Sequence, residues 1–165
     1  MKSRFNLLIH LILLLLLFLV SPVLCIAKTY SITDVNIDCT VLKDTRVSWL
    51  ENRTFQFQGD FSFGYYDLPM YGYDYIREIQ VSEKGSPYLL NESEQTGTFW
   101  VESFSDYHRV HYYYQAENET RTFDYAFYIE GGLDLYEDYG QFYWKLQGNG
   151  WGVPVDHLKA TIHLE

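Results

Sequence analysis

The sequence predicts an all-β fold: an immunoglobulin-like β-sandwich of about eight or nine strands, behind an N-terminal hydrophobic helix. Three observations indicate this class. Apolar and polar residues alternate in several short runs, which is the period of half-buried strands. Turn-forming Gly, Asn and Asp residues separate these runs, as in sandwiches and barrels. No window after Ala27 has helical spacing over a useful length, although the Cys-Trp-Cys framework of true immunoglobulin domains is missing.

Residues 1–27 have the layout of a secretory signal peptide: a basic start, an apolar run over residues 7–20, and a small residue, Ala27, at the exit. An uncleaved membrane anchor is the alternative, because the apolar stretch nearly reaches the ~20 residues that span a bilayer. Pro22 and Ala27 favour cleavage. Either way, residues 28–165 are predicted to form an extracytoplasmic domain, secreted or at the cell membrane facing outside, because the basic end stays inside.

The chain is acidic, with a formal net charge of −10. Loss of Lys2 and Arg4 with the leader would change this to −12. Nucleic acid is therefore excluded as an expected partner, because its binding depends on Lys and Arg that neutralise phosphates. Beyond the leader, Cys39 is the one thiol, so no internal disulfide is expected. Cys39 has the apolar parity of its strand and is expected to be a buried small hydrophobe.

Two strands are expected at the start of the domain, over residues 35–41 and 47–57. The first has alternating Val, Ile and Cys, and the second carries Trp and Phe on one parity. Glu51 and Arg53 share this apolar parity. Two explanations remain open: a β-bulge that resets the register, or a Glu51–Arg53 pair at the rim of the sheet.

Residues 61–75 are rich in Tyr, Gly and Asp without a clean period, so this stretch is expected to be mostly loop. The strand over residues 107–114 has aromatic residues on both faces and is expected to be central and covered on both sides. A further strand over 142–146, a glycine-rich turn and a last strand over 158–164 complete the fold. The predicted core comprises Trp49, Phe55, Phe57, Phe127, Phe142, Trp144, Leu158 and Ile162.

Seven short motifs follow in a specific order and spacing from Tyr30 to Leu164. They are Tyr30-Ser31-Ile32-Thr33-Asp34-Val35, Phe57-Gln58-Gly59-Asp60-Phe61, Asp67-Leu68-Pro69, Val81-Ser82-Glu83-Lys84-Gly85, Thr120-Arg121-Thr122-Phe123, Phe142-Tyr143-Trp144-Lys145 and Gly150-Trp151-Gly152-Val153-Pro154-Val155. Together they resemble the N-terminal extracellular domain of the predicted membrane proteins called domain of unknown function 2207. The resemblance implies an envelope-exposed β-sandwich followed by transmembrane helices, and it implies no activity.

Two departures from that family matter. Tyr66 stands where the family tends to have Arg before its Asp-hydrophobe-Pro motif, so any role of that cation is missing. The sequence stops at Glu165, before the expected membrane helices. We therefore expect a shortened relative or a truncated product, without those helices as an anchor.

The tyrosine-rich stretch over residues 65–75 is the candidate binding site, through Tyr65, Tyr66, Tyr71 and Tyr73. Tyr with Gly and Asp is typical of protein-binding loops, where large rigid side chains combine with adaptable hydrogen bonds. Tyrosine faces also stack on sugars. The alternative is that these rings cap the open end of the sandwich. The expected partner is an envelope protein or a polysaccharide, with membrane contact through the N-terminal segment if it stays uncleaved.

Asp134, Glu137 and Asp138 form an acidic loop. Paired carboxylates can cleave a glycosidic bond, which makes an envelope glycan-processing enzyme the rival hypothesis. They can also bind Ca²⁺, but their spacing matches no calcium loop, so a solvated acidic loop is favoured. A non-enzyme is therefore predicted.

No metal or cofactor is expected. His108 and His111 are an odd number of residues apart in a strand, so they point to opposite faces. His157 and His163 share a face but lie about 20 Å apart at strand rise. The Gly-x-Ser-x-Gly motif and phosphate-binding glycine loops are absent from the sequence.

Three sequons begin at Asn52, Asn91 and Asn118. Asn52 has the outward parity of its strand, and the other two are expected in loops. All three are predicted to be accessible, and each carries a glycan only in a host that glycosylates Asn.

Overall fold

The computed structural model describes residues 27–146 and 152–165. The predicted signal peptide or anchor and most of the glycine-rich turn before the last strand therefore lie outside the described residues. Within the described ranges, no helix is long and apolar enough to cross a membrane.

Twelve strands occur in this part of the chain: β1 (Thr29–Val41), β2 (Val47–Gln58), β3 (Asp60–Pro69), β4 (Tyr75–Glu83), β5 (Ser86–Pro87), β6 (Leu89–Leu90), β7 (Thr98–Ser103), β8 (Tyr107–Glu117), β9 (Thr120–Glu130), β10 (Leu133–Leu135), β11 (Gly140–Phe142) and β12 (Val155–Leu164). Eight of them have six residues or more, which agrees with the expected number. The other four are short pairings of two or three residues.

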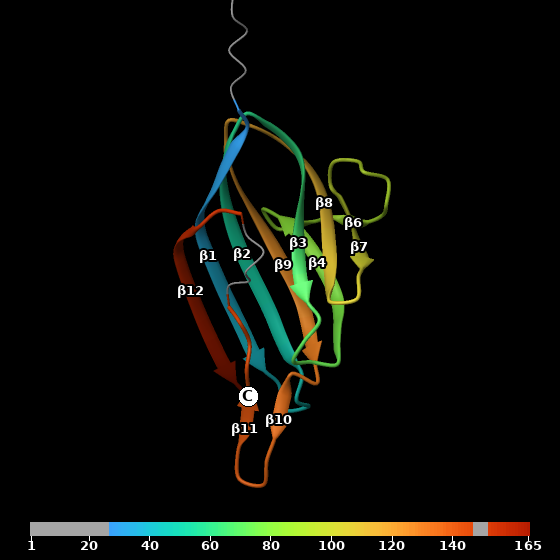
Figure 1. The fold of residues 1–165 in the computed structure, drawn as a ribbon, viewed down its shortest axis with the longest axis vertical. Coiled ribbons are helices and arrows are strands. Elements are labelled where there is room, and N and C mark those ends of the chain that lie inside the picture. The colour runs from blue at the N-terminus through green and yellow to red at the C-terminus, as the bar shows by residue number, and fades with distance from the viewer. Residues whose placement is uncertain (1–26, 147–151) are drawn as a thin grey trace, which may run out of the picture.

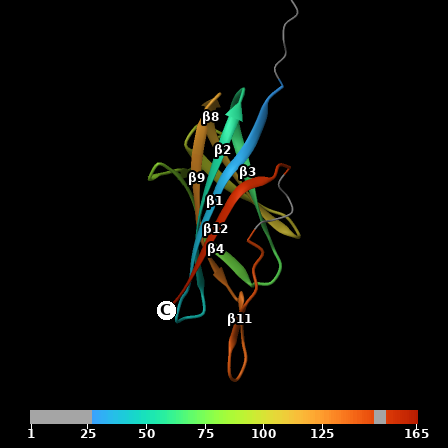
Figure 2. The ribbon, with the colours of Figure 1, turned by 90° about the vertical axis from the view of Figure 1, so that its left-hand side faces the viewer.

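The long strands form two sheets that face each other (Figures 1 and 2). The larger sheet has the order β12-β1-β2-β9-β4-β5, and the smaller has the order β3-β8-β7-β6. The first and last long strands, β1 and β12, run parallel side by side. The β10–β11 hairpin projects from one end of the molecule (Figure 1). The predicted all-β sandwich is confirmed.

The aromatic core lies where the two sheets overlap. Trp49, Phe55, Phe57 and Phe127 are buried, as expected from their parity. Phe57 of β2 lies 4.8 Å from the ring of Phe61 in β3, which places β3 over β2. Aromatic side chains from both inner faces thus pack between the two layers. Cys39 is also buried, and this burial raises the pKa of its thiol.

Phe142 and Trp144 are only half-buried, and Trp144 belongs to the connection after β11 rather than to a strand. The predicted strand therefore ends at Phe142. The indole of Trp144 packs 5.7 Å from that of Trp49, which itself stacks on Phe127 at 5.9 Å. Trp144 therefore covers part of the inner face of the larger sheet.

The expected burial of Leu158 and Ile162 is wrong: their side chains are 39% and 55% exposed. Both have the predicted inward parity, because they pair with the buried Val35 and Cys39 of β1. However, β12 is the edge strand of the larger sheet, and the four strands of the smaller sheet do not extend over it (Figure 1).

The expected loop over residues 61–75 is also wrong, because β3 occupies most of it and only Met70–Asp74 lie between strands. Aromatic residues occur on both faces of β3, which masks the alternation: Tyr66 is buried and Tyr65 is exposed. A bulge between Phe61 and Phe63 further disturbs the period.

β8 is central in its sheet, but it is covered on one face only, contrary to expectation. Its outward side chains are half-buried by their neighbours on the same face. The ring of His111 stacks on Trp100 at 4.2 Å, and the guanidinium of Arg109 lies 4.2 Å from the ring of Tyr65. Stacking between side chains of neighbouring strands thus covers this face, where the sequence predicts a further layer of structure.

Candidate binding groove

A groove follows β3 along the open side of the sandwich. Its volume is about 770 Å³, within the range of ligand pockets in proteins. The floor includes Tyr30, Phe55 and Phe57 of the larger sheet, while β3 and Tyr71 form one wall. The site is therefore mostly aromatic.

The groove exists because β3 is an edge strand that crosses over β2. Gly59 makes the reversal between the two strands with a φ of +91°, which favours glycine. Gly64 has a different role: a Cβ there would lie 2.5 Å from the hydroxyl oxygen of Tyr112. The missing side chain lets the Tyr112 ring reach beneath β3. Burial raises the pKa of Tyr112, so its hydroxyl stays protonated.

The four candidate tyrosines lie in different environments. Tyr65 and Tyr71 line the groove and are 46% and 62% exposed. Tyr66 points the other way and is buried between the sheets. Tyr73 is half-buried, with its ring 5.4 Å from that of Trp144. Two of the four residues are thus available to a ligand, while the other two are part of the packing.

An ion pair fixes the wall of the groove at Tyr65. Arg109 donates to the carboxylate of Asp67 through Nε and Nη2, at 2.7 and 2.8 Å. This bidentate bond raises the pKa of Arg109. The same guanidinium lies over the Tyr65 ring, an arrangement that favours cation–π attraction. Asp60, Asp106 and Lys28 are the other charged residues that line the groove.

A polar cluster lies buried beneath this wall. Arg53 donates to Glu51 through Nε at 2.8 Å, and a second nitrogen, Nη2, contacts the same carboxylate oxygen. Tyr66 donates to the other Glu51 oxygen at 3.0 Å. Burial raises the pKa of Tyr66 well above its ordinary value, so it remains a donor.

The cluster decides between the two sequence-based explanations for Glu51 and Arg53. β2 pairs with its neighbours through this stretch without a bulge, and the two residues do form a pair. The pair is almost fully buried rather than at the rim of the sheet. Since no solvent reaches it, its geometry is that of a structural core element rather than a site for substrate.

The chain matches the family described as predicted membrane protein (DUF2207) N-terminal domain over residues 31–165. It belongs to this family. This match confirms the resemblance inferred from the seven motifs. The family description names a predicted membrane protein and assigns no function. No curated protein matches the sequence.

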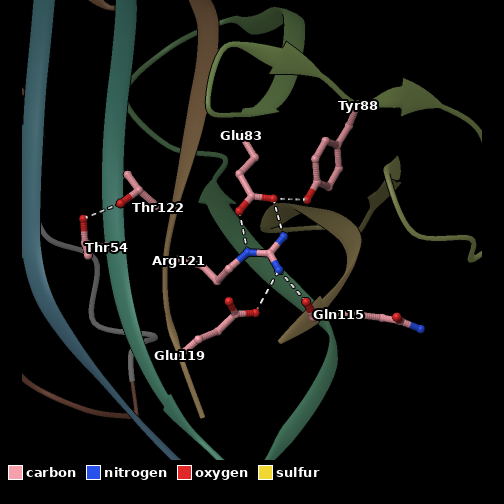
Figure 3. Close-up of polar contacts among 7 residues, drawn as sticks. All are labelled: Thr54, Glu83, Tyr88, Gln115, Glu119, Arg121 and Thr122. Atoms are coloured by element: carbon pink, nitrogen blue, oxygen red, sulfur yellow. Dashed lines mark hydrogen bonds and ion pairs between the residues drawn. The ribbon is translucent and has the colours of Figure 1, made fainter. Parts of the chain in front are cut away.

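A second polar cluster joins the two sheets of this DUF2207 domain (Figure 3). Arg121 of β9 contacts the carboxylate of Glu83 in β4 and the backbone oxygen of Gln115 in β8. Tyr88 donates to Glu83 at 3.1 Å, and Arg121 reaches Glu119 at 3.1 Å. The side chains of Arg121 and Glu83 are 16% and 10% exposed. The sequence placed both residues in family motifs but gave no sign that they meet.

The acidic loop of the DUF2207 domain lies on the β10–β11 hairpin. Asp134, Glu137 and Asp138 are all exposed there, and none of them lines the groove. Across residues 27–146 and 152–165, no three His, Cys, Asp or Glu side chains gather as metal ligands. His111 instead contacts Glu102 at 3.1 Å, and His163 contacts Asp38 at 3.3 Å.

The three sequons differ in their surroundings. Asn52 is half-buried in β2 and donates to Asp124 at 2.6 Å. Asn118 lies in the turn before β9, where its side-chain oxygen accepts from the backbone of Gly59 at 2.8 Å. Asn91 is exposed in the loop after β6. Of the three, Asn91 therefore offers the most accessible amide.

Proposed function

We propose that this DUF2207 domain is an extracytoplasmic interaction module of the cell envelope rather than an enzyme. Its contact surface is the groove along β3. The observation that carries the proposal is that Tyr65 and Tyr71 line this groove and remain about half exposed. Exposed tyrosines offer large, rigid contact area at low entropic cost.

The carboxylates of the groove suit binding better than catalysis. Asp60 begins β3, whereas Asp106 hydrogen-bonds through its backbone to Met70, just after β3 ends. At strand rise, these positions lie roughly 30 Å apart, far beyond the ~5–9.5 Å that separates the two carboxyl groups of glycosidases. Asp67 lies between them but is held by Arg109. This arrangement offers no acid–base pair within the groove.

The partner is an envelope protein or a polysaccharide. The formal net charge of −10 disfavours acidic glycans and anionic lipid surfaces, because like charges repel at short range. Contact energy then has to come from local apolar area, and the aromatic groove provides it.

A pull-down from the host envelope fraction tests the proposal with wild type and a Tyr65→Ala/Tyr71→Ala variant. Tyr73 is left unchanged because it packs on Trp144. The matched control is Tyr136→Ala/Tyr139→Ala, which removes two exposed tyrosines that stack on each other at 4.5 Å near the β10–β11 hairpin. We expect partners to be lost only from the groove variant, at an unchanged melting temperature. Identical partner profiles for all three proteins would remove the groove from consideration.

The enzyme hypothesis has its own test. The domain is incubated with envelope glycans, and reducing ends are measured for wild type and an Asp134→Asn/Glu137→Gln/Asp138→Asn variant. We expect no turnover from either protein. Turnover that disappears in the variant would replace the interaction module with a glycan-processing enzyme.

A further inference from the structure

We infer that the groove accepts an extended polypeptide strand of a partner protein, which pairs with the free edge of β3 and alternates apolar with basic side chains. The inference rests on the proposed function and names the class of partner. Three features of the groove carry it: the hydrogen-bonding edge of β3, the apolar floor, and the charges at its two ends.

The first feature is the edge of β3. Among the described residues, β3 pairs with β8 only, so its other edge presents backbone N–H and C=O groups without a strand partner. The groove lining follows this edge from Asp60 to Pro69, the full length of the strand. Such an edge is a ready template for another strand, and an added strand would lie about 4.8 Å from β3.

The second feature is the aromatic lining of the groove beside this edge. An added strand beside β3 would lie next to the half-buried ring of Tyr30, and beneath it lie Phe55 and Phe57, which the core already buries. Every second side chain of that strand would point to this aromatic floor, so apolar residues are favoured there. On the same side, Leu158 and Ile162 of β12 face inward but remain exposed. Among the described residues, these two side chains add accessible apolar surface beside the groove.

The third feature is charge. Asp60 and Asp106 lie at opposite ends of the groove, and neither forms an ion pair within the described ranges. Among the described residues, Lys28 is the one basic residue of the lining, and its ammonium lies 5.8 Å from the ring of Phe61. Asp67 is neutralised by Arg109, so Asp60 and Asp106 remain against Lys28. Together with the net charge of −10, they favour a strand whose remaining side chains are Lys or Arg.

The probe is a fluorescein-labelled peptide of about eight residues in which Lys and Val alternate, a usual strand length. A strand turns its backbone N–H groups alternately toward and away from the neighbouring strand. Two further peptides therefore carry N-methyl groups, one on every Lys nitrogen and the other on every Val nitrogen. A fourth peptide replaces each Lys with Glu. Affinity is measured by fluorescence anisotropy with the domain from Ala27 to Glu165.

We expect one N-methylated peptide to bind like the parent and the other to bind about tenfold more weakly or worse, because only one set of N–H groups faces β3. The Glu peptide should also lose about tenfold or more. The Tyr65→Ala/Tyr71→Ala variant should weaken binding of the parent peptide, whereas Tyr136→Ala/Tyr139→Ala should not. Hydrogen exchange should slow at β3 amides when the peptide is bound.

Equal affinity of the two N-methylated peptides would overturn the inference, because binding would then not involve strand pairing. Failure of the parent peptide to bind a folded domain would overturn it as well. If envelope partners still depend on Tyr65 and Tyr71 in the pull-down, the interaction module stands and its ligand is of another class, such as a polysaccharide. If peptide binding depends on the groove but no envelope partner does, the strand inference stands and the envelope role fails.

Discussion

Arg53 and Glu51, two residues apart on one face of β2, form an ion pair that is almost completely enclosed by the sandwich. A buried ion pair adds little net stability over an apolar pair, because removing two charges from water is costly. Breaking the pair is different, since it leaves one charge without its counter-ion. We therefore expect the pair to fix the register of β2 more than to raise the stability of the fold.

Arg53→Met should destabilise the domain by about 3–5 kcal/mol, because the Glu51 carboxylate stays buried without its counter-ion. The double variant Glu51→Leu/Arg53→Met should recover most of that loss. Urea unfolding followed by tryptophan fluorescence measures both. If the double variant is less stable than the single variant, the two residues do not act as a pair.

The two stacked tryptophans should differ in their contribution to stability. Trp49→Ala should cost about 3–5 kcal/mol, since Trp49 is fully buried. Trp144→Ala should cost about 1.5–3 kcal/mol, because Trp144 is half-buried in a connection outside the strands. Urea unfolding of the two variants gives the comparison. An equal or larger cost for Trp144 would mean that the connection after β11 belongs to the central core.

The Arg121 cluster should stabilise the fold more than an exposed ion pair does. Arg121→Met removes the contacts with Glu83 and with the Gln115 carbonyl, and should cost about 2 kcal/mol. Arg77→Met is the matched control, because the Arg77–Glu130 pair is more exposed and should contribute much less to stability. Thermal unfolding of both variants shows the difference. Equal losses would argue against a specific role for this cluster in joining the sheets.

Stability should fall in alkaline solution between pH 10 and about pH 12. Burial raises the pKa of Tyr73 from 10.0 to about 12, so the folded state holds the proton over a range where the unfolded state has lost it. The contribution of protonated Tyr73 to the free energy of unfolding is fully present below pH 10 and is lost as the pH rises through 12. Urea midpoints at several pH values should show this fall, and Tyr73→Phe should make it shallower.

The Tyr73→Phe variant also has a neutral-pH readout. The Tyr73 hydroxyl is buried without a hydrogen-bond partner among the described residues. Its removal should therefore leave stability at pH 7 unchanged or slightly higher. A clear loss at pH 7 would show that the hydroxyl has a partner in solution.

The sequence predicted the elements whose side chains alternate cleanly. β2 and β9 present aromatic residues on one parity, so Trp49 and Phe127 could be assigned to the core. β3 was missed because Tyr65 and Tyr66 put rings on both faces and a bulge breaks the period. Periodicity reports a change of environment between faces, and here both faces carry the same residue types.

The exposure of β12 and the formation of the polar clusters could not be predicted from the sequence for another reason. Periodicity gave the correct inward parity for Leu158, but its burial depends on how far the opposite sheet extends. Likewise, Arg121 and Glu83 are distant in the chain and meet only through the pairing of β4 with β9. The groove depends on how β3 lies against the larger sheet, which the sequence does not show. The tyrosines could therefore be proposed for binding, but the surface on which they lie could not be predicted.

The parallel alignment of β1 and β12 determines how the domain responds to pulling. Their register runs from Ile32–Val155 to Val41–Leu164, so the chain enters at one end of the long axis and leaves at the other (Figure 1). Tension applied between Ala27 and Glu165 acts along both strands in opposite directions and loads all of their hydrogen bonds in shear at once. The strands cannot unzip one bond at a time, which makes this pair a mechanical clamp.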